Sequence, residues 1–239
     1  NHQESCISIS IRKFRPKLAI YREIIYGGIP SLGRQGIASV ASHPLILIVP
    51  ALPGMAAIAA MSIVSRFMFF INSVIIGFGQ GFQPVCSYCF GAGLYNRVKK
   101  ACWFCIRIST IILLVLSVIC FPASHAIISL FRRNDPVVIE IGTLALRMQL
   151  LTLPLQGTVI MGNMMPQSIG YGFRATLVST ARQGIFLIPL LIVLTLSLGL
   201  LGIQCAQPLA DIATFLLALF VIRGIFKEFP EDVSSSAAQ

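Results

Sequence analysis

Residues 176–226 read TLVSTARQGIFLIPLLIVLTLSLGLLGIQCAQPLADIATFLLALFVIRGIF, and this stretch decides the fold. It holds two apolar runs, 176–198 and 201–226, which are separated by a short turn without charge. Each run is close to the roughly 20 residues that an α-helix needs to cross a bilayer. Because backbone groups that face lipid can be hydrogen-bonded only within their own helix, we predict two transmembrane helices here.

The rest of the chain continues this pattern. Four more apolar runs occupy 24–49, 55–82, 101–121 and 137–168. Of the 239 residues, 56% are hydrophobic and only 11% are charged, and the mean hydropathy is +0.86. A soluble domain carries roughly 25% charged residues, so a soluble enzyme, a disordered tail and a coiled coil are excluded. We therefore predict an all-α membrane protein with a bundle of six transmembrane helices.

The basic residues predict how the bundle is oriented. The chain has 18 Lys and Arg against 8 Asp and Glu, a formal charge of +10. The loops on one side would receive most of them: Arg12, Lys13, Arg15, Lys17, Arg22, Arg97, Lys99, Lys100, Arg107, Arg174, Arg182, Arg223 and Lys227. The other side would receive only Arg132 and Arg133. This asymmetry is typical of the positive-inside rule rather than of nucleic-acid binding, so we expect no nucleic-acid partner.

The same rule gives the domain organisation. We expect a basic cytoplasmic segment over 1–23, the transmembrane bundle over 24–226 and a cytoplasmic tail over 227–239. Both termini would then lie in the cytoplasm, with the bundle in the lipid bilayer of the plasma membrane.

Four charges fall well inside the predicted spans, away from their ends: Arg34, Arg66, Arg147 and Asp211. A charge at the bilayer centre costs roughly 2.5–3.5 kcal/mol, so each should face the bundle interior or water, or form an ion pair. Asp211 is the sole acid among them. It either pairs with one of these arginines for structural reasons, or it exchanges a proton or holds a cation during transport.

Uncharged polar residues form a second pattern. Gln149, Gln156, Asn163 and Gln167 recur at spacings of seven, seven and four, which places them on one face of a helix. Such a stripe is either a set of hydrogen bonds between helices or the wall of a wet cavity. Both interpretations remain open at the level of sequence.

The spacing of four cysteines is that of a zinc site, but their position at the ends of membrane helices argues against one. Cys86, Cys89, Cys102 and Cys105 form a CxxC-x12-CxxC pattern, which in a soluble chain is typical of zinc. Here each pair lies at or near the end of a membrane helix, and cysteine also packs well between helices. We therefore predict no metal site. No grouping of catalytic residues is visible either, so we expect no enzyme activity.

Several strings occur in order along the chain: GIPS at 28–31, GFGQGFQP at 77–84, FGAG at 90–93, PQSIG at 166–170, RQGIF at 182–186 and AQPLAD at 206–211. Together they resemble the C-terminal half of multidrug and toxic compound extrusion (MATE) transporters. The resemblance covers about residues 19–226.

This resemblance implies a fold and a function. The family has twelve helices in two homologous six-helix lobes, so the chain would be one lobe of a two-lobe transporter. Its partners would be the missing N-terminal half or a second chain. Members are secondary active antiporters that export drugs and organic cations in exchange for H+ or Na+, without a cofactor. Asp211 would be the coupling residue, and the cavity or gate would use Arg34, Gln80, Gln83, Arg147, Gln167, Arg182, Gln183 and Gln207.

Two alternatives remain. A related flippase for lipid-linked saccharides would need a cationic cavity, which Arg34, Arg66 and Arg147 could supply. A six-helix remnant that only packs against a partner chain would show no gradient-driven transport.

Overall fold

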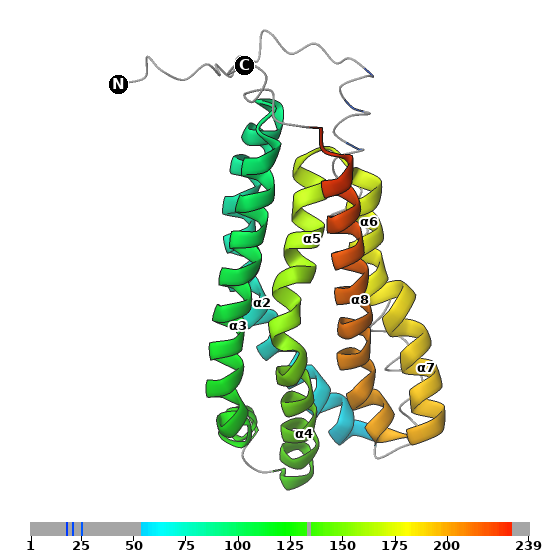
Figure 1. The fold of residues 1–239 in the computed structure, drawn as a ribbon. Coiled ribbons are helices and arrows are strands. Elements are labelled where there is room, and N and C mark those ends of the chain that lie inside the picture. Colours follow the sequence, from blue (N-terminus) through cyan, green and yellow to red (C-terminus); the bar gives the residue numbers. More distant parts are fainter. Residues whose placement is uncertain (1–17, 19–20, 22–24, 26–53, 133–134, 231–239) are drawn as a thin grey trace, which may run out of the picture.

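The computed structural model describes residues 18, 21, 25, 54–132 and 135–230, and in these segments the chain is helical (Figure 1). The elements are α2 (Gly54–Gly91), α3 (Tyr95–Phe131), α4 (Pro136–Thr152), the 3-10 turn η3 (Leu153–Leu155), α5 (Gln156–Ser168), α6 (Gly172–Thr180), the π-helical η4 (Ala181–Phe186), α7 (Leu187–Leu198) and α8 (Leu200–Glu228).

Five stretches of the described chain are long and apolar enough to cross a membrane: Ala56–Gly91, Tyr95–Phe131, Pro136–Ser168, Gly172–Leu198 and Leu200–Glu228. They correspond to the second to sixth predicted spans. The predicted span over 24–49 lies outside the described residues except for Ile25, and so does Arg34. The predicted run 101–121 was too short, because the helix that contains it extends over Tyr95–Phe131.

Helix α5 lies at the centre of the bundle and contacts α2, α3, α6 and α8 (Figure 1). All its residues from Gln156 to Pro166 are buried. Two glycines allow this close packing: a Cβ at Gly157 would lie 2.9 Å from the Cβ of Ser109 on α3, and one at Gly162 would lie 3.0 Å from that of Ala218 on α8. Small residues at such crossings are how membrane helices gain van der Waals contact.

Proline breaks the third described span into α4 and α5. Pro154 has no N–H to donate to the carbonyl of Leu150. The Ser117 hydroxyl of α3 donates to this oxygen at 2.6 Å, and the N–H of Leu153 also bonds to it. A neighbouring helix therefore satisfies the group that proline leaves free, as a membrane interior requires.

The fourth described span is interrupted by the π-helix η4 between α6 and α7. Pro189 follows it and cannot donate to the carbonyl of Ile185, which lies inside this wider turn. Segments of π-helix are rare and often occur at functional sites. The turn that follows α7 contains Gly199, whose φ of 59° is a left-handed conformation that glycine adopts without strain.

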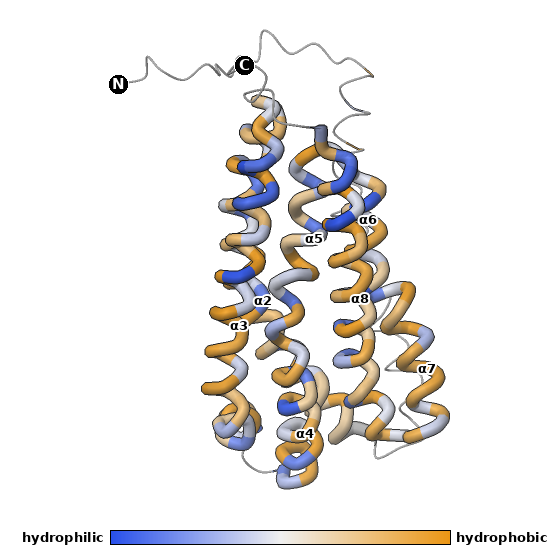
Figure 2. The backbone as a smooth tube through the Cα atoms, in the orientation of Figure 1, coloured by the Kyte–Doolittle hydropathy of each residue, from blue (hydrophilic) through white to orange (hydrophobic). Residues whose placement is uncertain are grey.

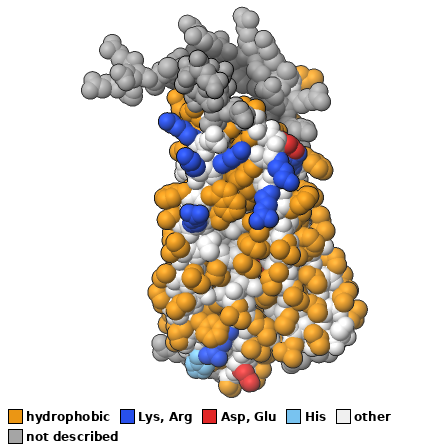
Figure 3. Space-filling view, viewed as in Figure 1, with side chains coloured by type: hydrophobic (Ala, Val, Ile, Leu, Met, Phe, Trp, Pro, Cys, Tyr) orange, Lys and Arg blue, Asp and Glu red, His pale blue; other side chains and the backbone are white. Residues whose placement is uncertain are grey.

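Polarity differs between the middle and one end of the molecule. Most of the bundle is hydrophobic along its length, whereas hydrophilic segments gather where α3 begins and α8 ends (Figure 2). Lys and Arg side chains are concentrated near this end, above a surface of mostly hydrophobic side chains (Figure 3). The distribution is the one expected for a membrane bundle whose basic end faces the cytoplasm.

Candidate functional site

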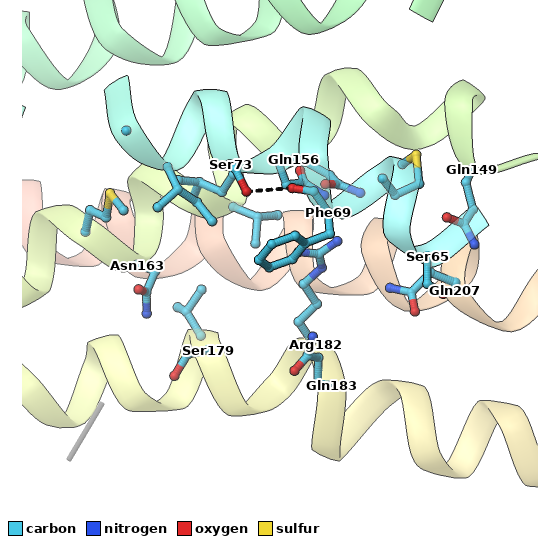
Figure 4. Close-up of a pocket in the computed structure, with 18 of the residues that line it drawn as sticks. Ser65, Phe69, Ser73, Gln149, Gln156, Asn163, Ser179, Arg182, Gln183 and Gln207 are labelled. Carbon is cyan, nitrogen blue, oxygen red and sulfur yellow. Dashed lines mark hydrogen bonds between the residues drawn. The ribbon is translucent and has the colours of Figure 1, made fainter. Parts of the chain in front are cut away.

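A cavity of about 570 Å³ lies among α2, α4, α5, α6, η4 and α8. This volume is within the range of about 300–1,000 Å³ that is typical of small-molecule sites. Its wall is rich in amide side chains: Asn72, Gln80, Gln149, Gln156, Asn163, Gln183 and Gln207. Apolar and aromatic groups complete the wall, among them Met68, Phe69 and Met164 (Figure 4). The cavity therefore combines hydrogen-bonding groups with adaptable apolar surface.

A buried carboxylate contacts residues of this wall but does not line the cavity itself. Asp211 of α8 is 1% exposed and forms an ion pair with Arg182, whose Nε lies 2.8 Å from its Oδ1. Two amides donate to the same carboxylate: Gln156 Nε2 to Oδ2 at 3.0 Å and Gln207 Nε2 to Oδ1 at 3.3 Å. Charge-assisted hydrogen bonds of this kind are roughly twice as strong as neutral ones, so the four side chains form one network.

Arg182 reaches Asp211 from η4. In Figure 4 its side chain extends from this helix into the space between the helices. The side chain is 21% exposed, and the residue also lines the cavity. Within the lining residues Arg182 carries the sole formal charge, and Asp211 neutralises it. The site formed by the described residues therefore has no net charge.

The identity of this ion pair corrects one sequence expectation. One of the two interpretations of Asp211 was an ion pair with Arg34, Arg66 or Arg147; the residue does form an ion pair, but with Arg182, which the loop pattern had assigned to the cytoplasmic side. The membrane-length stretch that contains Arg182, Gly172–Leu198, begins ten residues earlier. At 1.5 Å per residue this places Arg182 about 15 Å into the span.

The structure brings several of the expected site residues together. Gln80, Arg182, Gln183 and Gln207 line the cavity, and Asp211 lies directly behind Arg182.

Gln83 and Gln167 lie outside the cavity lining and hydrogen-bond to each other at 3.4 Å between α2 and α5. Beside them the Ser87 hydroxyl donates to the carbonyl of Ser168 at 2.9 Å. These contacts join α2 and α5 near their C-terminal ends.

Arg147 is separated from the cavity. Its side chain is exposed, donates from Nε to Ser124 Oγ at 2.9 Å and lies over the ring of Phe121 at 5.6 Å. These partners are on α3, so Arg147 lies at the junction of α3 and α4 rather than in the cavity wall. Arg66 is also exposed and is absent from the lining.

Some lining residues were not among the expected site residues. Gln156, which bonds directly to Asp211, was seen only as part of the polar stripe on one helical face. Gln149, Gln156 and Asn163 of that stripe all line the cavity, and Asn163 also donates to the carbonyl of Ala175 at 2.6 Å. The stripe thus serves both as cavity wall and as a link between helices.

The cysteine pattern does not form a metal centre in the described part of the chain. No three His, Cys, Asp or Glu side chains come together there in an arrangement that could hold a metal ion. Cys86, Cys102 and Cys105 are instead buried free thiols in the hydrophobic core.

Comparisons with known proteins agree on one family. The MatE family model matches residues 30–193. "Multidrug export protein MepA" of Staphylococcus haemolyticus is 27% identical over 235 residues, which are 98% of this chain and 51% of that protein. The MepA of Staphylococcus saprophyticus is 29% identical over 216 residues, 90% of this chain and 47% of that protein. The chain thus spans about half the length of these relatives.

Solved structures share the fold. An outward-facing multidrug resistance MATE family transporter of the MOP superfamily matches with a TM-score of 0.86 at 19% identity, over 95% of this chain and 51% of that one. The MATE transporter ClbM in complex with Rb+ matches with a TM-score of 0.79 at 22% identity, over 87% of this chain and 49% of that one.

Proposed function

The chain belongs to the MatE family of multidrug efflux transporters, and we propose that it forms one lobe of a secondary active exporter in the plasma membrane. The exporter would move drugs and organic cations out of the cell in exchange for H+ or Na+. The observation that carries this proposal is the amide-lined cavity of about 570 Å³ with a buried carboxylate–guanidinium pair behind it.

The cavity is open along one side of α2. Ser65, Phe69, Ser73 and Gln80 all line it, and all four are exposed. A second lobe, from the same polypeptide or from another chain, would complete the site on this side. Alternating access would then follow from rocking of the two lobes around a site between them.

The ion pair supplies a means of coupling. A proton or Na+ that binds Asp211 would weaken its attraction for Arg182, because the carboxylate would already be neutralised. The released guanidinium would turn its charge toward the cavity and repel an organic cation there. Ion entry would thereby favour substrate release, and the membrane potential would contribute about 2.3 kcal/mol per charge for each 100 mV.

Replacing Asp211 by asparagine tests this role. The amide can neither take up a proton nor neutralise the charge of Arg182. Gradient-driven efflux of a fluorescent organic cation from proteoliposomes should therefore fall about tenfold to a hundredfold. This range corresponds to the loss of roughly 1.5–3 kcal/mol from a charged hydrogen bond. Glu140→Gln, which removes an exposed carboxylate from α4, is the control and should leave efflux unchanged. Unchanged efflux in Asp211→Asn at equal membrane expression contradicts the coupling role.

No observation favours the flippase alternative. A flippase needs several cations around the pyrophosphate that links its saccharide to the lipid. Among the described lining residues Arg182 is the sole basic one, and it is paired with Asp211. Arg66 and Arg147 lie elsewhere, and Arg34 lies outside the described residues.

A further inference from the structure

We propose that the basic end of the bundle binds an anionic phospholipid at the junction of α3 and α8, with Arg107 and Arg223 holding the lipid phosphate. Neither arginine lines the cavity, so this lipid site is separate from the candidate substrate site. The inference goes beyond the proposed transport and does not depend on it.

Two aromatic rings join α3 and α8 near the basic end. The ring centroids of Trp103 on α3 and Phe226 on α8 are 6.5 Å apart. Trp103 is 36% exposed, and Phe226 packs against the buried ring of Phe229 at 5.8 Å. Trp is enriched where hydrocarbon meets headgroups, because its ring is apolar and its N–H is polar. The ring pair is therefore expected at the membrane surface.

Each helix places an arginine beside its ring. Arg107 follows Trp103 by four residues on α3, and Arg223 precedes Phe226 by three residues on α8. Residues at these spacings are neighbours on one helix face. Because α3 begins and α8 ends at the basic end, both arginines lie about one turn deeper than the rings (Figure 2). Both side chains are exposed.

The apolar runs place these arginines at the edge of the hydrocarbon. The run 108–131 of α3 contains no Lys, Arg, Asp or Glu and spans about 36 Å at 1.5 Å per residue. The run 200–222 of α8 spans about 35 Å and contains Asp211 alone, which is buried and paired. Both lengths are close to the roughly 30 Å of a hydrocarbon core. Arg107 and Arg223 are thus the first charges outside it, at the level of the lipid phosphates.

The charge around the site is complementary to a phosphate. Of the acids that the structure describes, Glu228 alone lies at this end, and it already bonds to Arg174 at 2.6 and 2.8 Å. Lys100 and Lys227 add exposed positive charge on the solvent side of the two arginines. Lys and Arg side chains gather around hydrophobic ones here (Figure 3). Guanidinium groups bind phosphate through paired N–H groups, and basic clusters at this level attract anionic lipids.

The same helix faces continue toward the membrane centre as apolar surface. Ile111 and Leu114 follow on α3 and are 55% and 50% exposed. Phe220 and Leu216 follow on α8 and are 77% and 61% exposed. The acyl chains of a lipid bound by its phosphate would cover these side chains, whereas a free phosphate ion would not. The occupant we propose is therefore a lipid.

Trp103 supplies the readout, because bromine on a lipid chain quenches the fluorescence of a tryptophan that it contacts. The native polypeptide that carries this chain is reconstituted in phosphatidylcholine with rising fractions of brominated phosphatidylglycerol or brominated phosphatidylcholine. The part of the fluorescence that Trp103→Phe removes reports on this site. Half-maximal quenching should need about tenfold less phosphatidylglycerol than phosphatidylcholine, since each basic residue near the surface favours anionic lipid by about fivefold.

Variants identify the groups that bind the lipid. Arg107→Gln and Arg223→Gln should each lower the preference for phosphatidylglycerol by about fivefold, and the double variant should bring it close to one. Arg132→Gln is the matched control, because it removes an exposed arginine at the opposite end of α3 and should leave the preference unchanged. Quenching by brominated phosphatidylcholine should be equal in all variants, which shows that Trp103 still contacts lipid in a folded protein.

Three results would overturn the lipid site. They are equal quenching by the two lipids in the wild type, a preference that the double variant retains, and a preference that Arg132→Gln lowers as much as Arg107→Gln does. The first result shows that no anionic lipid is selected, and the others show that the selection arises from overall charge rather than from these two arginines. The proposed transport stands or falls separately, with Asp211→Asn.

Discussion

Replacing Asp211 by alanine is expected to lower the free energy of unfolding by about 3–5 kcal/mol, because it leaves the guanidinium of Arg182 without its counter-ion inside the bundle. Gln156 and Gln207 lose their acceptor at the same time. The measurement is reversible unfolding in mixed micelles, followed by far-UV circular dichroism as the fraction of SDS is raised.

A double variant identifies the cause of this loss. Removing both charges, with Asp211→Ala and Arg182→Met together, should recover much of the stability that Asp211→Ala loses, because no unpaired charge remains. Glu140→Ala, at an exposed site, should change stability by no more than about 0.5 kcal/mol. If the double variant loses the sum of the two single effects, the pair is not coupled and the network has no energetic role.

Replacing Gly202 by alanine is expected to destabilise the hairpin of α7 and α8 by about 1–3 kcal/mol. A Cβ at this position would overlap the backbone carbonyl of Leu194. Because the obstacle is backbone rather than the end of a flexible side chain, relief requires that the two helices move apart. The same unfolding titration measures the loss.

Gly224 provides the matched control on the same helix. A Cβ there meets nothing within 4 Å, so Gly224→Ala should stabilise the protein by about 0.4–1 kcal/mol through the lower entropy of the unfolded chain. Equal stability of the Gly202→Ala and Gly224→Ala variants would show that α7 and α8 do not approach each other as described.

The sequence predicted the spans well because membrane insertion depends on the local run of apolar residues. The second to sixth predicted spans each lie in one of the five described membrane-length helices. The helical stripe of Gln149, Gln156 and Asn163 also predicted a shared face, since the spacing alone determines it. Whether that face lined a cavity depended on its neighbours, which the spacing does not reveal.

The positions of the charges were harder to predict. The partner of Asp211 depends on how α8 and η4 are rotated about their axes and on the wider turn of the π-helix that carries Arg182. Arg147 lies deep in α4 by sequence, but its long side chain reaches Ser124 at the junction with α3. Long cationic side chains can extend in this way, so depth along a helix does not fix where the charge lies.

The central claim is that this chain forms one of two lobes around a shared cavity. Native mass spectrometry of the assembly extracted from its own membrane tests it most directly. We predict a particle whose protein mass is about twice the 26.0 kDa of this chain, either as a single polypeptide or as two associated chains. A stable particle of 26.0 kDa with no second lobe would contradict the two-lobe exporter.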